Sequence, residues 1–317
     1  STLKQTYKDF EFLIIDDAST DNSLDYLKSL KDERIRLIRN KNNIGQVMSL
    51  NKGIDIAAGE YIARLDQDDV NLPKRFEEQI KYFIKNPNIA LLCSYEHTIN
   101  SKGVLILDWK KHIKNYGHFI GEIILGLCPI WHPSAMYKKA VVQQLGGYDI
   151  QFGPSEDYDL WAKFALGRYE AAIVPKFHLL QREHDNRQSI LFNDKQIKAN
   201  SVTNQNVINY FCSGNSLNCC TSSFLMLKND PCGNGFNGIH LKEIIKSAIE
   251  LFHNIEKRKN LSALEKKYLM KTIRNRLGYG IEIGYYFIFL PNFLFTILFF
   301  ILSPVYFYKM RNFFAII

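Results

Sequence analysis

The first hundred residues alternate between short apolar runs and segments with helical periodicity. The apolar runs have the length of buried strands, and the segments between them repeat apolar residues every three or four positions. Strands that alternate with helices in this way pair mostly in parallel and are covered by helices on both faces. The sequence therefore predicts an α/β fold with a mostly parallel sheet. The expected strands are 10–17, 34–40, 60–66 and 89–95, and the expected helices are 19–30, 43–59 and 73–86.

Aspartates directly follow two of these predicted strands. They are Asp16 and Asp17 after the first, and Asp66, Asp68 and Asp69 after the third. A solvated turn would explain them without a ligand, and Asp69 is also a candidate N-cap for the helix that begins near Pro73. In a parallel sheet, however, ligands bind beyond the carboxyl ends of the strands, and no lysine stands beside either cluster. We therefore expect both clusters to face a cation or a polar ligand.

A further acidic pair, Glu156 and Asp157, precedes an apolar helical stripe within residues 153–165. At the start of a helix such a pair complements the helix dipole, which contributes about 0.3–1 kcal/mol. The alternative is that the pair points into a substrate cleft. The sequence leaves both interpretations open.

The positive charge is concentrated near the carboxyl end. The formal net charge is +8, and residues 242–276 contain ten Lys or Arg and four Glu. Residues 283–308 follow with no charged side chain, and a bilayer span takes about 20 apolar residues. Flanking basic residues and tyrosines favour membrane association, as a kinked span or a re-entrant hairpin because Pro291 and Pro304 interrupt the segment. A buried core helix is the alternative.

These patterns predict four regions along the chain. They are an α/β domain over 1–195, a polar linker or irregular region over 196–240, a basic helical segment over 241–280 and an apolar membrane-associated tail over 281–317. The six cysteines form no CxxC pair or common zinc pattern, so we expect reduced thiols. With no visible signal peptide, the expected location is the cytoplasmic face of a membrane, attached peripherally or integrally through 281–308. Nucleic acid is not an expected partner, because no aromatic side chains interleave the basic ones.

Five motifs occur in an order that is typical of one enzyme family. They are "QTYKDFEFLIIDDASTDNS", "NIGQVMSLNKGIDIAAGEYIARLDQDD", "HPSAMYKK", "GGYD" and "SEDYDLW". Over roughly residues 1–190 the chain resembles glycosyltransferase family 2, the inverting nucleotide-sugar transferases of the Rossmann-like GT-A fold. The first motif has Ala18 where the family usually has Gly. The resemblance implies transfer of a hexosyl or N-acetylhexosaminyl group from a nucleotide diphosphate sugar to a hydroxyl of a saccharide or glycolipid, in cell-surface polysaccharide or glycoconjugate synthesis.

The resemblance also implies a metal site and a catalytic base. Asp66 and Asp68 match the family's DxD pair, with Asp68 as the nearer ligand of Mn²⁺ or Mg²⁺ and Asp66 closer to the ribose or sugar. Carboxylates suit such ions, which neutralise the diphosphate. Asp157 matches the base that deprotonates the acceptor hydroxyl, and Glu156 would orient the acceptor.

Further residues are implied on the nucleotide and acceptor sides. Asp17 matches an aspartate that accepts a hydrogen bond from the base, which favours UDP, and Asp16 and Asn51 are additional nucleotide-binding candidates. The candidates for the acceptor side and the closing loop are His132, Arg182, His184 and Arg187.

One departure from the family concerns the beginning of the sequence. Family members open with a strand and turn of the type "VSVIIPTYN", whereas this sequence begins at Ser1 in "STLKQTYKDF". The resemblance therefore predicts that the first strand is missing and that activity is impaired. Two other functions remain open: a degenerate, non-catalytic membrane-bound binding protein, and a nucleotidyltransferase, which also uses acidic metal ligands.

Overall fold

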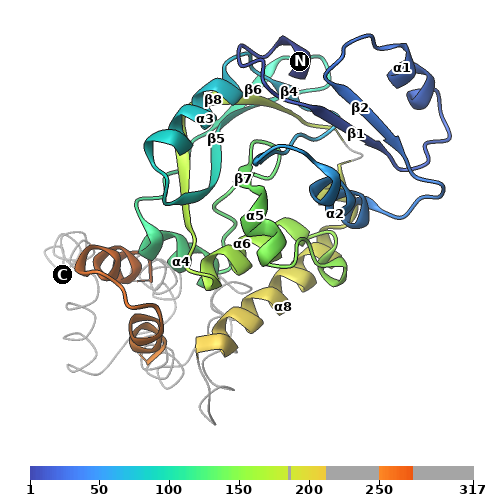
Figure 1. The fold of residues 1–317 in the computed structure, drawn as a ribbon. Coiled ribbons are helices and arrows are strands. Elements are labelled where there is room, and N and C mark those ends of the chain that lie inside the picture. Colours follow the sequence, from blue (N-terminus) through green and yellow to red (C-terminus); the bar gives the residue numbers. More distant parts are fainter. Residues whose placement is uncertain (185–186, 212–249, 274–317) are drawn as a thin grey trace, which may run out of the picture. The chain divides into compact units, whose positions relative to one another are not determined.

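The structure is a computed structural model that describes residues 1–184, 187–211 and 250–273 (Figure 1). The predicted apolar tail and most of the predicted polar linker lie outside the described residues. Within the described ranges, no helix is long and apolar enough to cross a membrane. The chain divides into two compact units, one of Ser1–Tyr116 with Cys128–Thr203 and the other of Gly117–Leu127 with Asn204–Ile317.

The first unit contains two sheets. Strands β1 (Phe12–Asp16) and β2 (Ile35–Arg39) form a parallel pair, with α1 (Ser23–Ser29) between them and α2 (Gln46–Ile56) after them. The second sheet has the order β3-β7-β5-β8-β4, and β6 also pairs with β5. Its strands are β3 (Tyr61–Ala63), β4 (Val70–Asn71), β5 (Ile89–Ile99), β6 (Leu105–Trp109), β7 (Met136–Lys138) and β8 (Glu170–Arg182). The helices after β4 that lie wholly or partly in this unit include α3 (Arg75–Lys85), α5 (Lys139–Gln144), α6 (Glu156–Leu166), α7 (Gln188–Leu191) and the start of α8 (Asn193–Phe211).

The predicted α/β class is confirmed, but the sheet is less parallel than predicted. The β1–β2 and β5–β8 pairs are parallel. The β3–β7, β4–β8, β5–β6 and β5–β7 pairs are antiparallel. The difference arises because β6 returns from β5 through a tight hairpin, because β4 joins the edge beside β8, and because β7 inserts between β3 and β5. The alternating pattern revealed none of these short strands.

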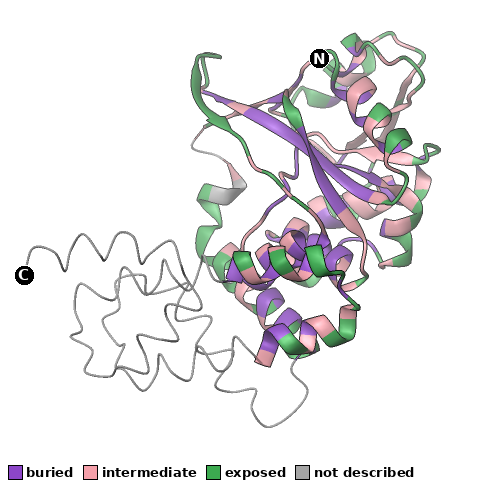
Figure 2. Ribbon diagram, turned by 90° about the vertical axis from the view of Figure 1, so that its left-hand side faces the viewer, coloured by how far each residue is buried: buried purple, intermediate pink, exposed green. Residues whose placement is uncertain are grey.

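Helices cover both faces of the second sheet. On one face, Phe76 and Phe83 of α3 pack with Leu92, Met136 and Val174 from three strands. The neighbouring residue in β7, Tyr137, points to the opposite face, where its ring lies 6.3 Å from that of Trp161 in α6. The long central strands β5 and β8 are accordingly drawn as mostly buried in Figure 2.

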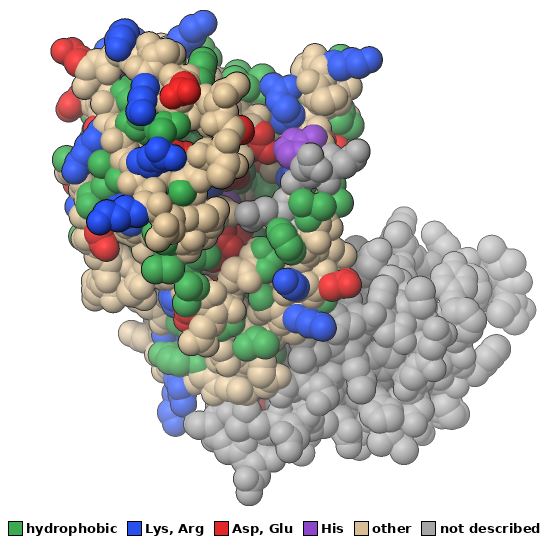
Figure 3. Space-filling model, turned by 90° about the vertical axis from the view of Figure 1, so that its right-hand side faces the viewer, with side chains coloured by type: hydrophobic (Ala, Val, Ile, Leu, Met, Phe, Trp, Pro, Cys, Tyr) green, Lys and Arg blue, Asp and Glu red, His purple; other side chains and the backbone are tan. Residues whose placement is uncertain are grey.

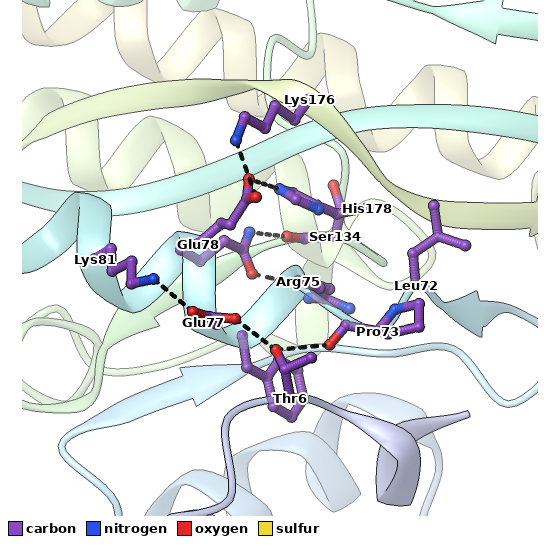
Figure 4. A network of polar contacts seen from close by, with 12 residues as sticks. Thr6, Leu72, Pro73, Arg75, Glu77, Glu78, Lys81, Ser134, Lys176 and His178 are labelled. Atoms are coloured by element: carbon purple, nitrogen blue, oxygen red, sulfur yellow. Dashed lines mark hydrogen bonds and ion pairs between the residues drawn. The ribbon is translucent and has the colours of Figure 1, made fainter.

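The amino-terminal residues cap α3. The buried side chain of Gln5 accepts a hydrogen bond from the Phe76 amide (3.0 Å) and donates to the Leu72 carbonyl (2.7 Å). Thr6 donates to Glu77 at 2.7 Å, as Figure 4 shows. The prediction that Asp69 caps this helix is therefore wrong, since Asp69 accepts instead from the Arg182 amide.

The second unit is helical in its described part. It contains most of α4 (Tyr116–Ile124), the end of α8, and helical residues 250–259 and 263–273. A capping box opens the helix of residues 263–273, because the Ser262 amide donates to Glu265 (2.8 Å) and the Glu265 amide donates to the Ser262 hydroxyl (3.3 Å). Residues 196–211, predicted to be linker, are helical because Val207, Ile208 and Phe211 recur at helical spacing and are buried.

Candidate active site

The loop 64–69 follows β3 and carries the DxD residues. The Arg64 amide donates to the Ala135 carbonyl at 2.8 Å, and the Asp69 amide donates to the Asp66 carbonyl at 3.2 Å, which closes a turn. The Arg64 guanidinium forms an ion pair with the Asp66 carboxylate. The sequence has no lysine beside this cluster, but this arginine, which directly follows β3 and stands two residues before Asp66, compensates its charge.

The end of β8 lies against this loop. His184 Nε2 is 2.7 Å from Asp68 Oδ2, and each of these side chains is 32% exposed. Arg182 Nε donates to the Asp68 carbonyl at 3.3 Å. The structure therefore brings Asp68, Arg182 and His184 together, although more than a hundred residues separate the two segments.

Asp69 is the buried member of the acidic loop. Its carboxylate accepts a hydrogen bond from the Arg182 amide at 2.9 Å. Burial, and after it the charges of Asp66 and Asp68, raise the pKa of Asp69 to about 7, against the lowering effect of that hydrogen bond. Asp69 therefore joins the loop to β8 rather than facing solvent.

Glu156 and Asp157 stand at the start of α6, as predicted. Burial is the main cause that raises the pKa of both carboxyls, and the charge of Glu156 then helps to bring the pKa of Asp157 to about 7. Asp157 remains partly exposed, accepts a hydrogen bond from the Tyr158 amide at 2.7 Å, and has Cys128 Sγ 4.0 Å from its Oδ2. A carboxyl with a pKa near neutrality can exchange a proton with a bound hydroxyl.

Electrostatic interactions join the loop to α6. The negative charge of Asp66 contributes to the raised pKa values of Asp69, Glu156 and Asp157, while the positive charge of Arg64 lowers the pKa of Glu156. On the face shown in Figure 3, acidic side chains lie in a hollow that has a histidine at its edge. The acidic loop and the start of α6 therefore influence each other electrostatically, and whether Glu156 and Asp157 contact a substrate stays a prediction.

Asp17 lies at the end of β1 and holds the start of α2. Its two carboxylate oxygens accept from Asn40 Nδ2 (2.8 Å), the Ile44 amide (2.9 Å) and the Gly45 amide (2.8 Å). Burial acts to raise the pKa of Asp17, but these hydrogen bonds outweigh it and leave the pKa below its ordinary value. Asp16 is buried beside it, with Oδ2 at 3.3 Å from Arg39 Nε. Contacts from either aspartate to a nucleotide stay predictions.

Two other predicted residues have clear structural partners. Asn51 donates to the Tyr148 carbonyl (2.7 Å) and accepts from the Tyr148 amide (2.9 Å). A Cβ on Gly147 would come within 2.6 Å of the Asn51 side chain, which explains the glycine in "GGYD". His132 is buried with Nε2 at 2.8 Å from the Tyr148 hydroxyl, and burial lowers the pKa of His132 to about 3, so it is neutral at pH 7. Their predicted contacts with nucleotide and acceptor stay predictions.

Arg187 interacts electrostatically with the acidic loop. Its positive charge lowers the pKa of Asp69, and its guanidinium is 3.7 Å from the Glu183 carboxylate. A second residue missed from the sequence is Glu96 in β5, which is fully buried. Burial raises the pKa of Glu96 to about 8, and the charge of Asp69 adds to this effect. A glutamate three positions after the apolar run of 89–93 is the signal that could have identified it.

The residues present fit a divalent ion only if a ligand supplies further oxygens. Within the described residues, no group of three or more His, Cys, Asp or Glu could hold a metal by itself. The pair formed by Asp68 and His184 presents a carboxylate oxygen and an imidazole nitrogen, both partly exposed. Mn²⁺ and Mg²⁺ accept carboxylate ligands and complete their coordination with water and phosphate oxygens. This donor set therefore suits a metal that arrives with a diphosphate.

Comparisons with known proteins identify the family of this chain. A model of Glycosyl transferase family 2 matches residues 1–146. The uncharacterized glycosyltransferase MJ1057 of Methanocaldococcus jannaschii is 37% identical over 207 residues, which cover 62% of this chain and 68% of that protein. An uncharacterized glycosyltransferase of Haemophilus influenzae is 31% identical over 227 residues, covering 66% of this chain and 68% of its own length. The O-antigen biosynthesis glycosyltransferase WbnJ of Escherichia coli is 35% identical over 169 residues, covering 51% and 63% respectively.

One solved structure is a more distant neighbour. The mannosyltransferase PcManGT from Pyrobaculum calidifontis, in complex with GDP-Man and Mn²⁺, is 15% identical, with a TM-score of 0.43, and the match covers 92% of this chain and 70% of that chain. The sequence relatives define the class of this protein, which is a glycosyltransferase. The chain belongs to glycosyl transferase family 2, as the motifs in the sequence indicated.

Proposed function

We propose that this protein is a metal-dependent inverting glycosyltransferase that moves a sugar from a nucleotide diphosphate sugar to a hydroxyl of a saccharide or glycolipid acceptor. One observation carries the proposal. The carboxyl of Asp157 is partly exposed and has a pKa raised to about 7. The charge of Asp66 in the acidic loop contributes to this raised pKa, so the two acidic groups interact. A base and a diphosphate site are the two elements that a single displacement requires.

On the donor side, Asp68 and His184 would hold Mn²⁺ or Mg²⁺ together with the diphosphate. When bound, this ion neutralises the charge that develops on the leaving diphosphate. Asp66, which Arg64 keeps in place through their ion pair, would lie nearer the ribose or the sugar. Arg182 fixes the loop by its contacts with the Asp68 carbonyl and the Asp69 carboxylate.

On the acceptor side, Asp157 would act as the general base. The acceptor hydroxyl gives its proton to the Asp157 carboxylate, its oxygen forms a bond with the anomeric carbon, and the bond from that carbon to the diphosphate oxygen breaks. The nucleotide diphosphate leaves with the bonding electrons, so the anomeric configuration inverts. The buried Glu156 would position the acceptor or the Asp157 carboxylate.

The finer assignments belong to the same proposal. A UDP-sugar is the favoured donor, because Asp17 is an ionised acceptor at the end of β1 and uracil offers an N–H donor. The product would enter a cell-surface polysaccharide or glycoconjugate, and the enzyme would work at the cytoplasmic face of a membrane. The relative WbnJ is named for O-antigen biosynthesis, which supports this acceptor class.

The test is turnover of a panel of nucleotide sugars, with and without Mn²⁺, by the protein and by three variants. Asp68→Asn should abolish the metal-dependent turnover, and Asp157→Asn should lower turnover while nucleotide binding persists. Asp55→Asn is the matched control, because Asp55 is an exposed aspartate near the end of α2 and should leave turnover unchanged. Metal-independent turnover, or full turnover in Asp157→Asn, would contradict the proposal.

A further inference from the structure

The hairpin of β5 and β6 exposes large apolar side chains. Val104, Leu105, Ile106 and Leu107 are 58%, 56%, 52% and 46% exposed, and Trp109 is 37% exposed. A register shift, in which Thr98 pairs with Leu107 and Ile99 with Leu105, leaves Ile106 without a partner in β5. The side chains of 105–107 therefore do not alternate strictly between the two faces, but each of them is about half exposed. Figure 2 draws exposed residues in green, and all residues from 101 to 110 belong to this class. Contiguous exposed apolar surface of this kind marks an interaction site.

The hairpin is a well-formed element. Glu96 to Ile99 of β5 pair in antiparallel register with β6. In the turn, the Asn100 side chain accepts from the Lys102 and Val104 amides at 3.0 Å each, and Gly103 adopts a positive φ of 82°. The apolar side chains are therefore presented by a hydrogen-bonded strand rather than by an irregular loop.

The charges around the apolar strand are mostly positive. Residues 100–114 contain four lysines, at 102, 110, 111 and 114, and the single acidic residue Asp108. Asp108 lies 2.7 Å from His97 and 3.8 Å from Lys110, so basic groups face it from both sides. Lys102 is exposed in the turn, next to the apolar tip. Apolar and tryptophan side chains flanked by lysines are typical of protein segments that enter the headgroup region of anionic membranes.

We propose that the β5–β6 hairpin docks on an anionic phospholipid bilayer, with the side chains of 104–107 in the acyl boundary and the exposed Lys102 and Lys110 among the headgroups. A second copy of this chain fits less well. Pairing along the free edge of β6 would leave the apolar side chains exposed and would bring two sets of lysines together. A bilayer surrounds these side chains and carries the complementary charge.

The hairpin is connected directly to the candidate active site. Arg182 Nη1 donates to the Asn100 and Ser101 carbonyls at 3.2 Å each, and its Nε donates to the Asp68 carbonyl. If the proposed transfer is correct, docking through the hairpin would place the acidic loop close to the membrane surface and to a lipid-linked acceptor. The docking itself does not depend on that function.

The test is hydrogen–deuterium exchange of the full chain with phosphatidylcholine vesicles and with vesicles that also contain phosphatidylglycerol. We expect the amides of 103–109 to exchange more slowly with the anionic vesicles than with the neutral ones. Ile106→Asp should abolish this local protection, and Lys102→Glu should reduce its dependence on anionic lipid. Ile84→Asp is the matched control, because Ile84 is 73% exposed on α3 and should leave the protection unchanged.

The local readout separates the hairpin from any other membrane-binding part of the chain. Anionic vesicles that bind the protein without protecting 103–109 would overturn the proposal, as would an equal effect of Ile84→Asp. Protection of 103–109 without lipid, together with a dimer in light scattering, would assign the surface to a second copy instead. Thermal unfolding serves as the folding control for every variant, and nucleotide binding tests the proposed function separately.

Discussion

At the scale of single residues, Ala18 shows how the loop after β1 deviates from the family pattern. Ala18 has a φ of 60°, in the left-handed region where the family usually has glycine. A left-handed conformation costs a residue with a Cβ about 1–2 kcal/mol. The neighbouring Asp16 and Asp17 side chains accept hydrogen bonds from this loop and the start of α2, so the tertiary structure holds Ala18 in that conformation.

Ala18→Gly should therefore stabilise the fold. Relief of the strain outweighs the entropy that glycine adds to the unfolded chain, and we expect the free energy of unfolding to rise by about 0.5–1 kcal/mol. Denaturant unfolding measures this change. Ala57→Gly is the matched control: Ala57 has a φ of −61° and carries no such strain, so the same substitution there should destabilise the protein. A loss of stability in Ala18→Gly would contradict the argument.

The raised pKa of Asp157 has a consequence for the pH dependence of turnover. Because burial and the charge of Glu156 raise this pKa to about 7, the carboxylate form needed for a base is populated only as the pH rises through that value. We expect kcat/KM to rise up to a pH of about 7 and then to level off. Asp157→Asn should remove this rise and lower kcat by about 10²–10⁴-fold. A pH profile that is unchanged in Asp157→Asn would assign the base elsewhere.

The sequence could predict those site residues whose chemical type and place in a secondary-structure element both point to a ligand site. Asp66, Asp68 and the pair of Glu156 and Asp157 were identifiable as acids at a strand end and a helix start. The pairing of Asp68 with His184 was not, because it depends on how β8 ends beside the loop. Burial decides other cases: His132 could equally have been an exposed acceptor contact until its partner Tyr148 was known.

At the scale of secondary-structure elements, α3 supports the acidic loop through one buried arginine. Arg75 has no exposed surface, and its guanidinium donates to the Arg64 carbonyl (2.6 Å), the Ala135 carbonyl (3.1 Å) and the Asn71 side chain. Burial lowers the pKa of Arg75 to about 10, so it still carries its charge at pH 7. Figure 4 shows the surrounding network, in which Glu78 lies between Lys176 and His178 of β8.

Arg75→Met should destabilise the first unit and loosen the loop. The substitution keeps much of the buried volume but leaves several carbonyl and amide oxygens without their donor, at a cost of about 2–4 kcal/mol. Thermal unfolding measures the loss. Lys81→Met in the same helix is the control, because Lys81 is largely exposed and pairs only at the surface with Glu77. Equal effects of the two variants would show that Arg75 has no special role.

Glu96 makes the stability of β5 dependent on pH. Its pKa is raised by burial from 4.5 to about 8, so the folded state binds this proton more tightly than the unfolded state. The resulting stability is fully present below a pH of about 4.5 and is lost as the pH rises through about 8. Glu96→Gln should remove this dependence. Relative to the natural chain, the variant should be about 1–3 kcal/mol more stable at pH 8 than at pH 5, which means a larger free energy of unfolding. A constant difference would contradict this assignment.

At the scale of the whole molecule, the class of fold was predictable and the strand order was not. The alternation of strands and helices gives the α/β class, because local periodicity reports which elements form. The positions of β4, β6 and β7 depend on pairings between distant residues, which periodicity does not encode. The second unit illustrates the same limit. Position 117 requires glycine because a Cβ there would come within 2.0 Å of the carbonyl oxygen of Glu265, a residue nearly 150 positions further along the chain.

Calorimetric titration of the protein with UDP and with GDP, in the presence and absence of Mn²⁺, tests whether the acidic loop binds a metal together with a nucleotide diphosphate. We expect binding that requires Mn²⁺, that is weakened about ten-fold or more by Asp68→Ala and by His184→Ala, and that is unchanged by Asp55→Asn. Nucleotide binding that is equally strong without metal, or insensitive to both of these alanine variants, would contradict this binding mode.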